Sequence, residues 1–196
     1  MASLPLFPLS TVILPDGLLP LRLFERRYLD MVKQCFQNDT GFGVCLIREG
    51  MEAGTPAQPY PMGTEVKIID FDQGSDGLLH ITTRGVREFQ ILTYAADESQ
   101  LLIGEVEFLE VPPTPDMAPD TERLAGTLKT VLELLEQRIP ISEWQMDNPA
   151  WIANRLIELL PLDAASKYEL LELHSTEARL NQLATLQIEF VRNQRD

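Results

Sequence analysis

Few residues in this sequence have the types and spacing that enzymatic chemistry requires. The two histidines, His80 and His174, are far apart, and neither has metal-ligand spacing to the two cysteines, Cys35 and Cys45. We interpret His80 as a strand residue and His174 as the residue that ends a helix. Cys35 falls on an apolar helix stripe and Cys45 in an expected strand, so we expect both thiols to be buried and unreactive.

Phosphate-binding and metal-binding patterns are equally weak. No glycine in the chain is followed by lysine, which excludes the G-x-x-x-x-G-K-[ST] loop that holds nucleotide phosphates. Two carboxylate pairs, Asp70 with Asp72 and Glu105 with Glu107, have a spacing that can ligate Ca²⁺ or Mg²⁺. On an acidic chain we interpret them as hydrated strand faces. We therefore expect no catalytic residue, no metal site and no cofactor.

The charge balance restricts the class of partner. The 196 residues include 16 Lys and Arg against 30 Asp and Glu, a formal net charge of −14. Cations that neutralise phosphates drive most nucleic-acid binding, so this charge disfavours nucleic acids and anionic membranes. The first positive charge is Arg22, prolines interrupt the apolar N-terminus, and no apolar run reaches the roughly 18 residues of a bilayer span. We expect a cytoplasmic protein.

A proline-rich segment divides the sequence into two parts of different texture. Four prolines lie between Pro112 and Pro119, where neither a helix nor a central strand can pass. Apolar and polar residues alternate before it, whereas apolar residues recur at helical spacing after it. We predict a β-rich subdomain at residues 1–111, a linker at 112–119 and a helical subdomain at 120–196.

The first part has the pattern of a sheet that encloses one helix. We predict about six strands, at Thr11–Leu14, Gly43–Arg48, Glu65–Phe71, Leu78–Thr83, Arg87–Tyr94 and Leu101–Leu109. An Asp-Gly pair predicts a hairpin turn at Gln73–Gly77. A helix from about Glu25 to Gln37 carries an apolar stripe, on which Phe24 and Tyr28 are expected to anchor it. Closure removes exposed edges, so we predict an α+β fold with a mostly antiparallel, barrel-like sheet.

The second part predicts four helices with recognisable capping residues. They are Asp120–Ile139, a helix opened by Asn148 and Pro149 and ended by Pro161, a helix from Asp163 to Leu173, and a helix from Ser175 to about Asn193. The last one has an apolar stripe of Leu180, Leu183, Leu186 and Phe190 and no glycine or proline stop. We expect it to be able to pair with a second copy as a homodimer.

Three motifs give the chain a resemblance to a known family. The sequence LPLFPL at 4–9, followed by VILPDG at 12–17 and LPLRLFERRY at 19–28, resembles the N-terminal domain of Lon proteases. MGTEVKI at 62–68 with TRGVR at 83–87, and IELLPL at 157–162, extend the likeness over nearly the whole chain. Arg26 departs from the family's usual proline. The resemblance implies a PUA-like β subdomain, and a bacterial-type relative of peptidase family S16 without its protease domain.

The resemblance also implies a non-catalytic role in recognising polypeptide. The corresponding Lon domain helps to select unfolded or degron-bearing substrates, so we expect such a polypeptide, or a partner protein, as the ligand. The loop at 49–62 lacks periodicity and carries adaptable side chains, and two tryptophans flank or occupy the second predicted helix of the helical part. The candidate contact residues are Met51, Tyr60, Met62, Trp144 and Trp151.

Two alternatives remain at this point. PUA-like folds include RNA-binding modules, and Arg84 and Arg87 would then form a small basic site on the hairpin. The acidic charge and the lack of an aromatic–basic cluster weigh against this alternative. The other alternative is a small-ligand pocket between the two subdomains, which the sequence neither supports nor excludes.

Overall fold

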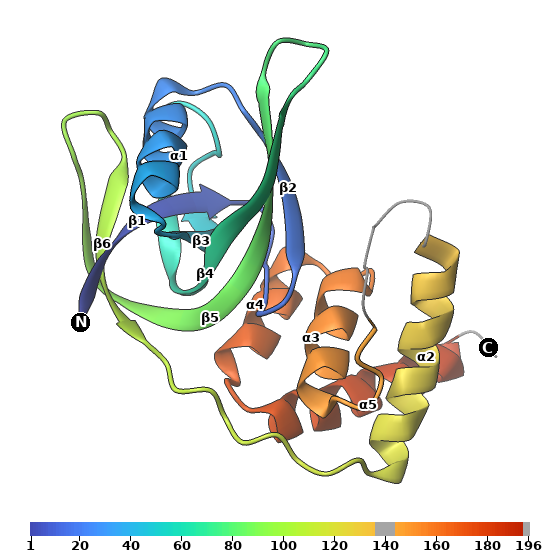
Figure 1. The fold of residues 1–196 in the computed structure, drawn as a ribbon. Helices are drawn as coiled ribbons and strands as arrows, with labels where there is room; N and C mark the ends of the chain where they lie inside the picture. Colours follow the sequence, from blue (N-terminus) through green and yellow to red (C-terminus); the bar gives the residue numbers. More distant parts are fainter. Residues whose placement is uncertain (136–143, 194–196) are drawn as a thin grey trace. The chain divides into compact units, whose positions relative to one another are not determined.

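The chain divides into two compact units, Met1–Glu110 (unit 1) and Val111–Asp196 (unit 2). The structure is a computed structural model, and it describes residues 1–135 and 144–193 (Figure 1). The first unit consists of strands around one helix, and the second consists of helices. The predicted α+β class, a mostly antiparallel sheet with one helix followed by a helical part, is confirmed.

Unit 1 is a closed barrel with one added strand. Its strands are β1 (Ala2–Leu9), β2 (Leu18–Leu23), β3 (Phe42–Glu49), β4 (Gln58–Gln73), β5 (Leu79–Ala96) and β6 (Leu102–Phe108). The order β5-β4-β3-β1-β6 closes because β6 pairs back onto β5. The β2 strand pairs with the first part of β5, and β6 pairs with its last part. Of these pairings only β1–β3 is parallel.

The first two strands differ from the sequence prediction. The predicted strand at Thr11–Leu14 is wrong, and β1 and β2 on either side of it were missed because both contain prolines. Pro5 lies where β1 pairs only with β6, and Pro8 lies where β1 pairs only with β3. At each of these prolines, one side of the strand has no neighbouring strand. A missing N–H on that side loses no interstrand hydrogen bond. Pro20 is tolerated for the same reason, because β2 pairs with β5 alone.

The β4 and β5 strands are much longer than predicted and project beyond the barrel as a hairpin (Figure 1). The strand β5 joins two predicted strands into one, and register shifts near Glu65 and Ile68 in β4 bend the pair without ending it. The predicted hairpin turn is confirmed between Gln73 and Leu79, where Gly77 has a φ of 79° that glycine adopts without strain.

The helix α1 (Arg26–Asn38) packs its apolar face against the strands of the barrel. As predicted, its stripe of Tyr28, Met31, Val32 and Cys35 is buried, and the Tyr28 ring stacks on Phe7 with centroids 3.8 Å apart. Phe24 is not an anchor, because it precedes the helix and 62% of it is exposed. Helical spacing fixes the direction of side chains only within the helix itself.

Unit 2 contains α2 (Pro119–Leu135), α3 (Pro149–Leu159), α4 (Ala164–Glu172) and α5 (Thr176–Asn193). The predicted caps are confirmed: Asn148 accepts from the Ala150 and Trp151 N–H groups, and Asp163 accepts from Ser166 N–H at 2.7 Å. The predicted end of the first helix, Ile139, and the side chain of Phe190 lie outside the described residues. Dimerisation through α5 therefore stays a prediction.

A buried arginine joins three of these helices. Arg179 of α5 donates hydrogen bonds to the carbonyl oxygens of Leu170 and Leu171 at the end of α4, at 3.0 and 2.8 Å. Its third hydrogen bond reaches the Asn154 side chain of α3 at 3.1 Å. The guanidinium thereby supplies further donors to the carbonyl groups at the C-terminal end of α4, where the regular helical hydrogen bonds stop.

Candidate functional site

Three phenylalanines on the surface of unit 1 lie near the projecting hairpin. Phe24 and Phe71 are each 62% exposed, and Phe36 of α1 is 44% exposed. Phe36 and Phe71 contact edge to face, with ring centroids 5.0 Å apart. Exposed aromatic rings that gather in one region usually mark a binding surface, because their hydration is unfavourable.

A groove lies between the start of α1 and the hairpin, beside these rings. It has a volume of about 470 Å³. Its lining is mainly apolar and consists of Leu23, Phe24, Leu29, Phe71, Asp72, Gln73, Gly77, Leu78 and Leu79. We call this lining, together with Phe36, the aromatic groove. An apolar hollow with few polar groups is the usual form of a site for apolar side chains.

Arg27 holds the α1 side of the aromatic groove in place. This buried arginine pairs with Glu25 at 2.9 Å, donates to the Gln100 carbonyl at 2.9 Å, and lies 4.7 Å from the centroid of the Tyr28 ring. Glu25 is the N-cap residue of α1, but its side chain makes no capping hydrogen bond. Its carboxylate is used by Arg27 instead, which fixes the backbone next to Phe24.

Asp76 links the hairpin side of the aromatic groove to β2. Its carboxylate accepts a hydrogen bond from Leu78 N–H at 3.0 Å and pairs with Arg22 of β2 at 2.8 Å. The Leu78 N–H is the main reason that the pKa of Asp76 lies below its ordinary value. His80, expected as a strand residue, is on β5 and contacts the same carboxylate at 3.4 Å.

The hairpin side of the groove is acidic. Residues 68–79 include Asp70, Asp72 and Asp76 and no lysine or arginine. Asp70 accepts a hydrogen bond from the backbone N–H of Phe71 at 2.9 Å. The groove therefore combines apolar walls with carboxylates, and this combination suits a ligand with apolar and basic side chains.

The structure separates the candidate residues of the 49–62 loop. Met51 is 75% exposed and Tyr60 is half-buried, whereas Met62 is buried in β4 opposite Gln90. The interpretation of Met62 as a surface contact is wrong, because β4 begins at Gln58 and takes the end of the loop into the sheet. None of the three lines the aromatic groove.

The two tryptophans of unit 2 also differ. Trp144 is 37% exposed, but Trp151 is only 3% exposed and packs in α3. Trp151 is therefore not a surface anchor. Every residue of α3 from Trp151 to Ile157 is buried, so the helix has no exposed face over that stretch.

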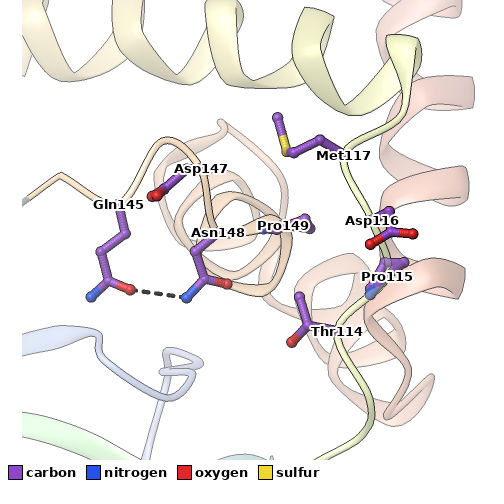
Figure 2. A pocket seen from close by; sticks show the side chains of 8 residues that line it. All are labelled: Thr114, Pro115, Asp116, Met117, Gln145, Asp147, Asn148 and Pro149. Atoms are coloured by element: carbon purple, nitrogen blue, oxygen red, sulfur yellow. Dashed lines mark hydrogen bonds between the residues drawn. The ribbon is translucent and has the colours of Figure 1, made fainter.

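A second hollow, of about 650 Å³, lies within unit 2 near the start of α3 (Figure 2). Its lining is mostly polar: Thr114, Pro115, Asp116, Met117, Gln145, Asp147, Asn148 and Pro149. Asn148 bonds Gln145 at 2.9 Å and caps α3, as Figure 2 shows for the first of these contacts. Its amide thus serves the fold, and the hollow has little apolar surface to offer an unfolded chain.

The arginines of the nucleic-acid alternative do not form a free basic site. Arg87 pairs with Glu65 at 2.6 Å, and its guanidinium carbon lies 3.4 Å from the centroid of the Phe108 ring. Arg84 is exposed on β5, next to Leu18 of β2 in the register. One of the two positive charges is therefore already matched by a carboxylate, which weakens attraction to phosphates.

The two cysteine thiols are withdrawn from the surface. Cys35 and Cys45 are buried as predicted, and burial raises the pKa of both thiols. Within residues 1–135 and 144–193, no group of three or more His, Cys, Asp or Glu residues has metal-binding geometry. Over the same residues, no helix has the length and apolar character that would let it cross a membrane.

Comparison with known proteins identifies the family. The family model described as the ATP-dependent protease La (LON) substrate-binding domain matches residues 3–186. Curated relatives include the Lon proteases of Dictyoglomus thermophilum, 22% identical over 92% of this chain, and Bacillus thuringiensis, 23% identical over 93%. The chain spans about a quarter of their length, 23% and 24% respectively.

Solved structures agree with this assignment. A Lon N-terminal domain protein from Xanthomonas campestris is 38% identical with a TM-score of 0.79, and the match covers 94% of this chain and 98% of that one. The N-terminal domain of Lon protease from the Mycobacterium avium complex has the same fold, with 20% identity, a TM-score of 0.64, and coverage of 93% and 96%. Family membership supports a role in substrate recognition. Because the family model accounts for nearly all of the sequence, this protein belongs to the LON substrate-binding domain family.

Proposed function

We propose that this protein binds unfolded segments of other polypeptides at the aromatic groove, without changing them chemically. The observation that carries the proposal is the grouping of Phe24, Phe36 and Phe71 around one apolar hollow. Folded proteins bury most of their large apolar side chains, whereas unfolded segments present them. A groove of this kind therefore distinguishes the two states without reading a particular sequence.

Ion pairs on the two sides of the groove support this role. Arg27 pairs with Glu25 on the α1 side of the groove, and Asp76 pairs with Arg22 on its hairpin side, so both sides of the backbone are tied before a ligand arrives. A preformed site loses less conformational entropy on binding than a flexible one. Met51 and Trp144 are further exposed apolar residues, and we include them in the proposal as secondary contacts outside the groove.

A binding titration with a matched pair of ligands tests the proposal. Lysozyme that is reduced and alkylated with iodoacetamide stays unfolded, and native lysozyme has nearly the same strongly basic charge. We expect saturable binding of the unfolded form and at least tenfold weaker binding of the native form. Equal binding of the two forms would show that charge alone is recognised, and would contradict the proposal.

A pair of variants locates the site. Phe24→Ser with Phe71→Ser removes two exposed rings of the groove, and we expect it to weaken binding at least tenfold. Leu92→Ser with Tyr94→Ser removes two apolar side chains of β5 that are 44% and 41% exposed and lie outside the groove lining, and should leave the affinity within about twofold. Equal losses in the two double variants would refute the groove as the binding site.

A single-stranded RNA is the third ligand in the titration. The charge of −14 and the pairing of Arg87 with Glu65 lead us to expect no saturable RNA binding at physiological salt. Binding that fades steeply with salt and is lost in Arg84→Gln would instead favour the nucleic-acid alternative.

A further inference from the structure

The strand β4 has an unpaired edge beside the aromatic groove. The register between β3 and β4 ends at Phe42 and Val66, whereas β4 continues to Gln73 with β5 on its other side. Within the described residues, β4 from 67 to 73 therefore has a strand partner on one side only. Figure 1 shows this part of the β4–β5 hairpin projecting from the barrel. Unpaired edges of this length attract other strands unless a protein blocks them.

A local side chain occupies one donor of this edge. The backbone N–H of Phe71 donates to the Oδ1 atom of Asp70 at 2.9 Å, so the donor serves this carboxylate. A register shift leaves Ile69 without a partner on β5, and its side chain is 49% exposed. The Phe71 N–H of this edge thus bonds a neighbouring side chain and no strand. It lies between two exposed apolar side chains, Ile69 and Phe71.

We propose that this edge of β4 binds its polypeptide ligand as an added β-strand, with apolar side chains directed to the aromatic groove and a basic side chain next to Asp70. The inference rests on the proposed function and specifies how the ligand is held. A carbonyl group of the incoming strand displaces the Asp70 carboxylate from the Phe71 N–H. The displaced carboxylate is then free to pair with a lysine or arginine of the ligand.

Backbone pairing explains how one site accepts many sequences. Every polypeptide carries the same N–H and C=O groups, so hydrogen bonds along an edge provide affinity that does not depend on side chains. Side chains alternate between the two faces of a strand, so apolar residues at every second position reach the groove side. Recognition is thereby limited to extended, unfolded segments, because a folded protein keeps its own strands paired.

Charge supplies the preference for a basic ligand. Residues 68–79 carry three aspartates and no lysine or arginine, and Lys67 at the start of the edge pairs with Asp39. Within the described residues, Asp76 is the one of these three aspartates that an arginine, Arg22, matches. A lysine beside Asp70 in the added strand gains an ion pair that a neutral residue lacks. An acidic ligand would place like charges side by side and would be repelled.

Backbone N-methylation tests strand addition directly. The probe is a labelled nine-residue peptide in which valine or phenylalanine alternates with lysine. Two further versions carry N-methyl groups on the amides of one strand edge or of the other. We expect one methylated version to bind at least tenfold more weakly than the parent peptide, and the other to bind within threefold. Equal binding of all three peptides would overturn strand addition while leaving groove binding intact.

The same titration separates this inference from the proposed function. If the parent peptide and unfolded lysozyme both fail to bind, the proposed function itself fails. If the parent peptide binds and both methylated versions lose affinity equally, the peptide is not held by a single edge and the inference is wrong.

A double-mutant cycle tests the contact with Asp70. Asp70→Asn keeps an acceptor for the Phe71 N–H but removes the charge. We expect this variant to weaken the lysine peptide about three- to tenfold and to leave a version with norleucine in place of lysine unchanged. Glu105→Gln removes an exposed carboxylate from β6 and is the matched control, which should affect the two peptides equally. Equal effects of Asp70→Asn on both peptides would overturn the proposed charge contact.

Discussion

Replacement of the buried Arg27 tests whether the α1 side of the groove depends on it. Arg27→Met keeps the length of the apolar stem and removes the guanidinium. That group is 5% exposed, pairs with Glu25, donates to the Gln100 carbonyl and covers the Tyr28 ring. Arg26, its neighbour on α1, is 87% exposed and pairs with Asp30 on the surface. Arg26→Met is therefore a matched control.

The magnitude follows from the contacts that are lost. The charged hydrogen bond to Gln100 contributes about 2 kcal/mol, the ion pair with the partly exposed Glu25 about 1, and the ring contact about 1. The Nε atom of Arg27 is buried and has no hydrogen-bond partner among the described residues, so its removal returns about 1–2 kcal/mol. We expect a net loss of about 2–3 kcal/mol for Arg27→Met and less than about 0.5 kcal/mol for Arg26→Met.

The assay must report on unit 1 alone. Both tryptophans lie in unit 2, so their fluorescence follows unit 2, whereas hydrogen exchange of the α1 amides follows unit 1. We expect Arg27→Met to raise the exchange rate across α1 by roughly 30- to 150-fold, the equivalent of the stability lost, with the tryptophan-monitored urea midpoint unchanged. Similar exchange in the Arg26 and Arg27 variants would refute the structural role of Arg27.

Three further predictions concern the two units separately. Arg179→Met removes three buried hydrogen bonds and should lower the stability of unit 2 by about 2–4 kcal/mol in tryptophan-monitored urea unfolding; a change no larger than that of the exposed Arg123→Met would contradict this. The Ser166 N–H lowers the pKa of Asp163, so the stabilisation is present at neutral pH and is lost as the pH falls through about 4 toward the folded-state pKa. Between pH 6 and pH 3 the urea midpoint should therefore fall less in Asp163→Asn than in the unchanged protein. Parallel plots of midpoint against pH for the two proteins would contradict this role of Asp163. Burial raises the pKa of Cys35 and Cys45, so both thiols should resist iodoacetamide at pH 8 until urea unfolds unit 1. Alkylation of the folded protein at the rate of a free thiol would contradict their burial.

Local patterns in the sequence were sufficient for several elements. The apolar stripe of α1, the caps Asn148 and Asp163, and the Asp-Gly turn each depend on residues within a few positions of one another. Their energetics are therefore nearly independent of the rest of the chain. The strands with prolines were missed because their tolerance depends on which neighbouring strand pairs at each position, as for Pro5 and Pro8 in β1.

The candidate site depended on long-range structure that the sequence does not display. Phe71 is exposed because the pairing of β3 with β4 stops at Val66, before Phe71 is reached. Phe24 is exposed because it precedes the helix whose apolar stripe it was expected to join. One signal was available: Phe71 stands between Asp70 and Asp72 just before a turn, an unusual place for a core aromatic residue. Trp151 shows the converse, since this aromatic residue was expected as a surface contact but is buried within a stretch of α3, Trp151 to Ile157, in which every residue is buried.

Hydrogen exchange of the whole chain, with and without saturating unfolded lysozyme, tests the central claim most directly. The account predicts slower exchange in peptides covering residues 24–36 and 69–79, with smaller changes around the secondary contacts Met51 and Trp144, little change at 87–96, and no protection by native lysozyme. Protection that falls elsewhere while the groove peptides exchange as in the free protein would contradict the assignment of the aromatic groove as the polypeptide-binding site.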